Sequence, residues 1–418
     1  MKPLSTGICR HSAAANREPS LRTELADRPQ LSAKEAARFT PEHYLARGGL
    51  LAALTPAWRP GRPDDTHADY TVGTGGSHAS LQEAVNAAIR SGRTQRQSIR
   101  VLPGIYRGVT YIPADAPPLC IFGAGASADE VRLELALDSR MNTAEYAAAV
   151  NPSGQFRPGD PAWYMYAACA NLPAGQLIDT PAAAVFWSQA CDLQLCRLSI
   201  VNTLLDTVDG STHQAVALRS DGDRTQLEEV RLVSRQDTFF CNAGAPARVD
   251  NRLGAYPEDR LARVFARHCY VEGDTDYVFG RAVAVFDACH FHSVSSRHTR
   301  PAIVFAPNTL CDQPLGFLAV HCRFTGDTFH SLNAGCFLGR SWDFAARNGY
   351  RPGITANGQL VVRDSHIGTA YHLTTPWNHA ATSARPFACA PGPDRNLDDP
   401  AFNRMWEFNN RGPGSGRV

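Results

Sequence analysis

Two aspartates occupy equivalent positions in consecutive copies of a repeating segment. Asp237 lies seven residues after Val230, and Asp276 lies seven residues after Cys269. If the two copies form adjacent strands, which lie about 4.8 Å apart, their carboxyl groups lie side by side on one face. Two carboxylates that close disfavour joint ionisation, so one of them holds its proton more tightly. The spacing predicts one ionised nucleophile and one protonated general acid.

Three polar side chains favour this chemical interpretation over a purely structural role for the aspartates in coil corners. Gln236 directly precedes Asp237, and Gln214 begins the apolar segment 214–218. Both glutamines carry amide hydrogens that can be donated to a developing negative charge. Arg340 has a planar guanidinium group, which can hold a carboxylate through two hydrogen bonds. The chain therefore offers two neutral donors and one cation to the predicted carboxyl pair.

The register of the two aspartates depends on a segment that recurs six times. Each copy has a small or compact apolar residue, then a polar or aromatic residue, then a larger apolar residue. The spacings between successive copies are 34, 39, 20, 33 and 43 residues, and the shortest approximates one bare coil. This pattern is typical of a solenoid whose coils each add a strand to parallel sheets. The first apolar positions of the six copies are Cys196, Val230, Cys269, Cys289, Cys322 and Ser365.

The rest of the chain from about residue 100 also predicts strands. Apolar runs of four to eight residues recur between Gly, Pro, Asn and Asp, and no long helix interrupts them. A β-sandwich would need hairpin turns of the Asn-Gly or Asp-Gly type, which are scarce here. We therefore predict an all-β fold, a right-handed parallel β-helix.

The repeat also explains several of the twelve cysteines. Side chains of a strand alternate between its two faces, so Cys196, Cys269, Cys289 and Cys322 are predicted to form an interior ladder. Buried free cysteine behaves as a small apolar residue, and packing is favoured here over disulfides or metal ligands. No Cys-x-x-Cys pair occurs, so the spacing of a zinc ribbon is missing.

The N-terminal region differs from the solenoid in composition. Residues 1–32 are rich in Ser, Arg, Ala and Pro without periodicity and are predicted to form a mobile arm. Ser32 and Glu35 match a capping box, which predicts a short helix as far as Ala46. A second helix is predicted over 78–89. We expect an N-terminal arm over 1–65, partly disordered, and a β-helix domain over 66–418.

Charge and hydropathy exclude several classes of function. The formal net charge is +1, which argues against a protein built to bind nucleic acid. Lysine occurs only at Lys2 and Lys34, so a Schiff-base lysine or a phosphate-loop lysine is excluded beyond residue 35. No stretch approaches 18 consecutive apolar residues, so no membrane span is expected. The first 22 residues contain no apolar core of a secretory signal.

Two other candidate sites are weaker. Ser341 nearly fits a nucleophile elbow, but Asp343 stands where the closing glycine is needed. His290 and His292 point to the same face of a predicted strand, where a solvated face is favoured over metal ligation.

Four blocks of the chain resemble, in order, the signature blocks of the pectin methylesterase (pectinesterase) family, and two more resemble its early and C-terminal motifs. Any one block is weakly specific, but the ordered set is highly specific and spans roughly residues 70 to 415. The family fold is a right-handed parallel β-helix of the pectin-lyase type, which agrees with the repeat. The blocks are Gly104-Ile105-Tyr106, Gln214-Ala215-Val216-Ala217-Leu218, Gln236-Asp237-Thr238, Asp276-Tyr277-Val278-Phe279-Gly280, Leu338-Gly339-Arg340-Ser341-Trp342 and the segment from Trp406 to Gly414.

The resemblance implies a role for each polar residue of the site. Asp276 is expected to attack the methyl-ester carbonyl at C6 of a galacturonate unit, and Asp237 to act as general acid and then general base. Gln214 and Gln236 are expected to stabilise the oxyanion. Arg340 is expected to orient the nucleophile. The substrate-binding side chains are expected to be Trp342, Phe240 and Tyr277, with loop packing as the alternative for Phe240. No metal and no cofactor is expected.

The resemblance also implies a substrate and a location. The substrate is expected to be pectin, a methyl-esterified polygalacturonate, cleaved to pectate and methanol by a monomer. Because this polymer lies outside the cell, we expect the protein to be secreted or held in the cell envelope, in pectin catabolism and cell-wall modification.

An insertion over 241–260 departs from the common family pattern and leaves the substrate open. It resembles a bacterial branch whose members are labelled both pectinesterase and acyl-CoA thioesterase. One alternative is therefore a hydrolase with the same fold and site that acts on another ester or a thioester. A second alternative is a non-catalytic β-helix that binds polysaccharide.

Overall fold

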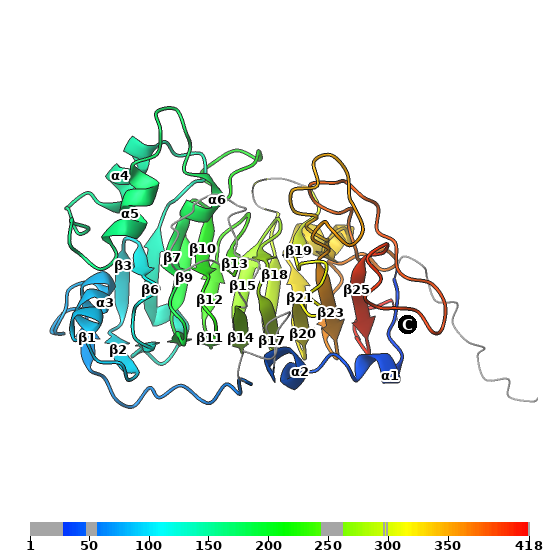
Figure 1. The fold of residues 1–418 in the computed structure, drawn as a ribbon, viewed down its shortest axis with the longest axis horizontal. Coiled ribbons are helices and arrows are strands. Elements are labelled where there is room, and N and C mark those ends of the chain that lie inside the picture. The colour runs from blue at the N-terminus through cyan, green and yellow to red at the C-terminus, as the bar shows by residue number, and fades with distance from the viewer. Residues whose placement is uncertain (1–27, 47–56, 244–261, 296, 298–299, 417–418) are drawn as a thin grey trace, which may run out of the picture.

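The computed structural model describes residues 28–46, 57–243, 262–295, 297 and 300–416. Its strands form three sheets that run along an elongated solenoid (Figure 1). We call these sheets A, B and C. The chain passes through them in turn, so that each coil adds strands in parallel register to those of the preceding coil. The prediction of a parallel β-helix is therefore confirmed.

The strands of each sheet are given in chain order. Sheet A consists of β1 (Tyr70–Val72), β2 (Gln97–Val101), β5 (Leu119–Gly123), β8 (Gln194–Cys196), β11 (Thr225–Glu228), β14 (Arg263–Arg267), β17 (Val283–Asp287), β20 (Phe317–Val320), β23 (Gln359–Arg363) and β25 (Arg404–Phe408). Sheet B consists of β3 (Gly104–Arg107), β6 (Val131–Leu135), β9 (Ser199–Asn202), β12 (Arg231–Val233), β15 (Tyr270–Gly273), β18 (His290–Ser293), β21 (Arg323–Gly326) and β24 (His366–Ile367). Sheet C consists of β4 (Thr110–Ile112), β7 (Ala184–Ser188), β10 (Val216–Ser220), β13 (Phe239–Cys241), β16 (Val278–Gly280), β19 (Ile303–Pro307) and β22 (Phe337–Gly339).

The corner between sheets A and B repeats one backbone conformation along the solenoid. Two residues separate the two strands in successive coils from β8 onward: the first has positive φ, and the second points into the core. Cys269, Cys289 and Cys322 follow residues with positive φ and lie in the main apolar core as free thiols. Burial raises the pKa of the Cys269 and Cys289 thiols well above the ordinary value. The interior ladder is therefore confirmed for these three cysteines, which serve as packing residues.

Cys196 is not part of that ladder, and its predicted position is wrong by two residues. Strand β8 pairs with β11 so that Cys196 lies opposite Glu228, before the corner. The residue equivalent to Val230 is Leu198, which follows the positive-φ residue Arg197. Cys196 instead packs with Cys120 and Phe122 in a small separate apolar cluster.

Both predicted helical regions near the N-terminus contain helices. Ser32 and Glu35 form the expected capping box at α1 (Ala33–Ala36), and α2 (Pro41–Ala46) follows. Residues of this region pack against the outer face of sheet A, where Tyr44 and Phe39 are fully buried (Figure 1). Helix α3 (Leu81–Arg90) begins at a second capping box.

The limits of the N-terminal region lie partly beyond the structural description. Residues 1–27 are outside the described residues, so the arm and the domain boundary at residue 65 stay predictions. None of the described helices is long and apolar enough to cross a membrane.

An insertion between β6 and β7 was not predicted. It contains α4 (Thr143–Val150), α5 (Trp163–Ala170) and α6 (Asp179–Ala182), which rise above one end of the solenoid in Figure 1. The helices are short, and their aromatic residues join a second apolar cluster with the outer face of sheet C. The insertion therefore covers part of the sheet that carries the candidate site. Two further helical turns are η2 (Ala128–Glu130) and α7 (Thr328–Asn333).

Candidate active site

Asp237 and Asp276 lie one coil apart at the corner between sheets B and C. Strands β13 and β16 pair Phe239 with Val278, which places the two aspartates opposite each other. The backbone N–H of Asp237 donates to the carbonyl of Thr275 at 3.0 Å. Both aspartates have positive φ, +68° and +48°, a conformation that Asp tolerates better than most residues. The structure thus contains the predicted side-by-side arrangement.

Arg340 joins this pair from two coils further along. It directly follows β22, and its Nη2 donates to Oδ2 of Asp276 at 2.5 Å. The ion pair is largely shielded, because the two side chains are 25% and 14% exposed. No described residue donates a hydrogen bond to the other oxygen, Oδ1 of Asp276, which is buried. One oxygen of Asp276 is therefore held by Arg340, and the other has no hydrogen-bond donor among the described residues.

The two carboxyl groups are in different electrostatic environments. Burial and the adjacent negative charge of Asp276 raise the pKa of Asp237 well above its ordinary value, against a smaller opposing effect of Arg340. Burial opposes the charged form of Arg340, but the charge and hydrogen bond of Asp276 outweigh it and raise the pKa of the guanidinium. The site therefore favours the protonated form of Asp237 beside an ion-paired Asp276.

Gln214 and Gln236 flank the aspartates and pair with each other through an isolated parallel bridge. The Oε1 atom of Gln214 accepts a hydrogen bond from the Ser139 hydroxyl at 2.6 Å. The Oε1 atom of Gln236 accepts one from the backbone N–H of His213 at 3.3 Å. Both amide oxygens are thus engaged by the protein, which leaves the amide nitrogens as the donors available to a ligand.

These side chains line one pocket of about 210 Å³. All five polar residues predicted for the site contribute to it, together with Trp342. Four further lining residues were missed, of which Thr180 comes from the helical insertion and Ala381 from a late loop. Neither small residue has a sequence signal, because its place depends on how a distant loop folds back. The lining residues are Thr180, Gln214, Gln236, Asp237, Asp276, Phe279, Ala306, Arg340, Trp342 and Ala381.

Trp342 is the one predicted substrate-binding side chain that reaches the pocket. Its ring lies 6.0 Å from that of Phe279 and 5.3 Å from that of Phe344, centroid to centroid. It is partly exposed, so part of the indole surface is available to a ligand. A flat apolar surface at this position suits a sugar ring.

The predicted roles of Tyr277 and Phe240 in substrate binding are wrong. Tyr277 is fully buried in the core between the sheets, where its hydroxyl contacts that of Ser293, because it alternates inward beside the outward-facing Asp276. Phe240 points outward but is also fully buried, stacked on Phe279 with ring centroids 4.3 Å apart. The helical insertion contributes to the cluster that covers Phe240, so packing is its role.

The other residues singled out in the sequence lie away from the pocket. Both His290 and His292 contact the hydroxyl of Thr325, at 2.7 and 2.8 Å. Within the described ranges, no group of three or more His, Cys, Asp or Glu side chains is arranged to hold a metal ion. Most of the insertion over 241–260 lies outside the described residues.

Comparison with known proteins gives consistent matches along most of the chain. The sequence model of the pectinesterase family matches residues 254–348. Pectinesterase B of Dickeya dadantii (strain 3937) is 52% identical over 91% of this chain and 89% of its own length. A protein of Escherichia coli (strain K12), provisionally named acyl-CoA thioester hydrolase YbhC, is 42% identical over 93% of this chain and 88% of its own.

A solved structure supports the same relationship at the level of the fold. The rice weevil pectin methyl esterase superimposes with a TM-score of 0.83 and 32% identity, covering 94% of this chain and 99% of that one.

Proposed function

The chain belongs to the pectinesterase family of carboxylic ester hydrolases, and we propose that it removes methyl groups from pectin through an acyl-enzyme on Asp276. The observation that supports this mechanism most directly is the asymmetric carboxyl pair. Within the described part of the chain, Asp276 has one oxygen held by Arg340 and one without a donor, and Asp237 beside it has a raised pKa. That combination supplies a nucleophile and a proton donor within one pocket.

In the first step, Oδ1 of Asp276 attacks the C6 carbonyl carbon of a methyl-esterified galacturonate unit. The carbonyl oxygen becomes an oxyanion, which the amide nitrogens of Gln214 and Gln236 stabilise. The bond between C6 and the methoxy oxygen then breaks, and Asp237 gives its proton to the departing oxygen. Methanol leaves, Asp237 becomes a carboxylate, and C6 stays bound to Asp276 as an anhydride.

In the second step, water releases the acyl group. The Asp237 carboxylate takes a proton from a water molecule, whose oxygen attacks C6 and again forms an oxyanion beside the two glutamines. The bond between C6 and Asp276 breaks, and the Asp276 carboxylate returns to its ion pair with Arg340. The product is a free galacturonic acid unit of the polymer, and Asp237 is protonated for the next cycle.

We propose that the substrate is the polymer and that the protein acts on it as a monomer. Trp342 provides a surface beside the carboxyl pair for a sugar ring. Since pectin lies outside the cell that makes the enzyme, the protein is then secreted or held in the cell envelope, in the breakdown or modification of plant cell walls.

A second candidate substrate is an acyl thioester. It is favoured by the 42% identity to YbhC, whose name refers to that activity. The same nucleophile and oxyanion donors would serve, because a thioester carbonyl passes through the same tetrahedral intermediate. A binding protein without catalysis would not need the five polar side chains that converge on the pocket.

The test compares both substrates with one purified protein. We expect methanol release from highly methyl-esterified pectin and no hydrolysis of palmitoyl-CoA. The variant Asp276→Asn should keep the circular dichroism spectrum of the wild type and release no methanol. Wild-type protein that cleaves the thioester but releases no methanol would contradict pectin as the substrate and favour the second candidate.

A further inference from the structure

The carboxamide groups of Gln214 and Gln236 must each be oriented so that the nitrogen faces the oxyanion. A glutamine carboxamide has an accepting oxygen and a donating nitrogen of nearly the same size, related by a half-turn of its last torsion. Only the nitrogen stabilises an oxyanion, and the oxygen in its place would repel the charge. A site with two such residues therefore needs something that selects the correct face of each one.

Ser139 is the hydrogen-bond partner of the Gln214 carboxamide oxygen. The Ser139 hydroxyl donates to Oε1 of Gln214 at 2.6 Å, and the backbone N–H of Ser139 donates to the backbone carbonyl of Gln214 at 3.0 Å. Ser139 is itself fixed, because its carbonyl accepts from the backbone N–H of Asp179 at 3.0 Å and its surface is 4% exposed. Asp179 precedes the pocket residue Thr180. Residues from the two ends of the helical insertion are thus hydrogen-bonded to each other, and Ser139 is hydrogen-bonded to Gln214, the expected oxyanion donor.

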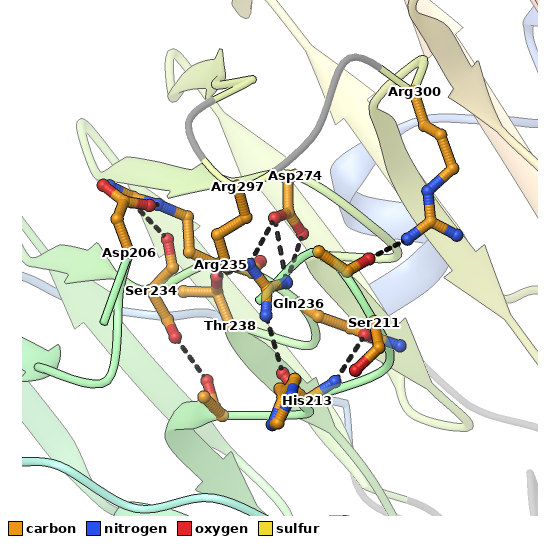
Figure 2. Close-up of polar contacts among 12 residues, drawn as sticks. Asp206, Ser211, His213, Ser234, Arg235, Gln236, Thr238, Asp274, Arg297 and Arg300 are labelled. Atoms are coloured by element: carbon orange, nitrogen blue, oxygen red, sulfur yellow. Dashed lines mark hydrogen bonds and ion pairs between the residues drawn. The ribbon is translucent and has the colours of Figure 1, made fainter. Parts of the chain in front are cut away.

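Gln236 is oriented by a backbone group instead. The N–H of His213 donates to its Oε1, and His213 is itself held through its imidazole and its carbonyl. The imidazole Nδ1 lies 2.6 Å from Oδ2 of Asp138, and the His213 carbonyl accepts from Arg297 at 3.4 Å. Figure 2 shows Arg297 reaching between this carbonyl and Asp274.

We propose that Ser139 is a positioning residue for ester hydrolysis, which directs the amide nitrogen of Gln214 toward the oxyanion through its hydrogen bond to Oε1. The proposal rests on the proposed function, because it assigns Gln214 the role of oxyanion donor. It gives the helical insertion a part in the reaction, since Ser139 and Asp138 come from the segment that enters it. We expect loss of the Ser139 hydroxyl to lower kcat more than it changes KM, because this hydroxyl contacts Gln214 and does not line the pocket.

The variant Ser139→Ala tests this role with little change to the backbone. The two main-chain hydrogen bonds of residue 139 remain, and only the donor to Oε1 is lost. We expect kcat for methanol release to fall about 10-fold, less than the 10²–10³-fold loss typical of removing a whole oxyanion donor, while KM changes less than about twofold. Ser139→Thr, which keeps a hydroxyl, should recover most of the loss.

A matched control and a double mutant separate positioning from general structure. Ser199 is equally buried and its hydroxyl donates to the carbonyl of Ala128 at 2.8 Å, away from the pocket, so Ser199→Ala should keep kcat within about twofold. In a Gln214→Ala background, Ser139→Ala should have almost no further effect, because the residue through which it acts is gone. An equal loss in both backgrounds would overturn the proposal, as would wild-type kcat in Ser139→Ala.

A crystal structure of the Ser139→Ala variant tests the proposal without any assay. We expect the Gln214 carboxamide to rotate or to occupy two orientations. A carboxamide that stays in place, with Oε1 still directed at residue 139, would overturn the proposal. Absence of methanol release by the wild type would contradict the proposed function, and the crystal structure would still decide whether Ser139 orients the Gln214 carboxamide.

Discussion

Two corners of the solenoid use the same kind of strained backbone for different purposes. The corner between sheets A and B places a residue with φ between +49° and +56° in seven coils, and the corner between sheets B and C has positive φ at Asp237 (+68°) and Asp276 (+48°). Arg, Glu, His, Ala, Asp and Asn all occur at the first corner, so its backbone conformation is set by the path of the coil and not by the type of side chain. The seven residues are Arg197, Glu229, His268, Ala288, His321, Asp364 and Asn409.

Asp364 and Asp237 make the comparison most directly, because each is an aspartate with positive φ at one of these corners. Partial burial of Asp364 is outweighed by hydrogen bonds from Asn409 and Arg363, which lower the pKa of its carboxyl group. Burial beside Asp276 raises the pKa of Asp237. Backbone strain alone therefore does not mark a functional site in this fold. Burial next to a like charge distinguishes the catalytic corner.

The largest expected difference comes from the same substitution at both corners. Asp276→Asn removes the nucleophilic oxygen and should lower kcat by more than about 10³-fold. Asp364→Asn should leave kcat within about twofold, because Asn also tolerates positive φ and the residue is remote from the pocket. Initial rates of methanol release measure both variants. A comparable loss in Asp364→Asn would contradict the separation of the two corners.

Each of these two aspartates has an arginine partner, and the partners should differ as well. Arg340→Met removes the donor to Oδ2 of Asp276 and should lower kcat by about 10²-fold without unfolding the protein. Arg363 pairs with Asp364 at 2.7 Å and also donates to the carbonyls of Ala36 and Phe39. Arg363→Met should therefore lower the free energy of unfolding by about 1–3 kcal/mol and spare kcat. Rates and urea unfolding of both variants check this, and a stability loss with full activity in Arg340→Met would refute it.

The buried cysteines that follow the corner between sheets A and B should affect the stability of the fold and not the catalytic rate. Cys289→Ser places a hydroxyl in the apolar core and should lower the free energy of unfolding by about 1–3 kcal/mol, with kcat unchanged. Cys191 is exposed, so Cys191→Ser should change stability by less than about 0.5 kcal/mol. Urea unfolding at one pH compares the two, and equal stabilities would argue against the packing role.

The last difference is a pH dependence of stability that has opposite sign at the two corners. Asp237 keeps its proton in the folded protein above pH 3.8, where the unfolded chain releases it, so wild-type stability falls as pH rises toward the folded pKa. Asp237→Asn should lack this loss, and its advantage over the wild type should grow with pH by at most about 1.4 kcal/mol per unit. Asp364 stabilises the fold above pH 3.8 and loses this contribution at lower pH.

Urea unfolding of both variants between pH 3 and pH 8 checks these signs. The deficit of Asp364→Asn relative to the wild type should shrink as the pH falls below 3.8. An advantage of Asp237→Asn that is constant with pH would show that Asp237 has an ordinary pKa in the folded protein.

The sequence was informative wherever the chemistry lay within one coil or its neighbour. The interior cysteines and the paired aspartates follow from spacing, because a parallel coil repeats its register. Cys196 was placed wrongly because the segment 195–198 imitates the repeat two residues early. In a straight strand a shift of two residues keeps the same face, but the positive-φ residue Arg197 turns the chain between them.

Exposure of the aromatic residues could not be read from the same pattern. Phe240 faces outward, as alternation requires, yet the cluster formed with the helical insertion buries it. Tyr277 is adjacent to Asp276 and therefore faces the opposite way. Of the three side chains predicted to bind substrate, only that of Trp342 faces outward and is also partly exposed.

By itself the sequence determined the parallel solenoid and the register that places Asp237 beside Asp276. The tertiary structure decided which oxygen of Asp276 is held and which way Gln214 presents its amide. Arg340 lies 64 residues from Asp276 in the chain, and Ser139 lies 75 residues from Gln214. A repeating pattern encodes neighbours in successive coils, whereas contacts across such distances depend on how irregular loops close over the sheet.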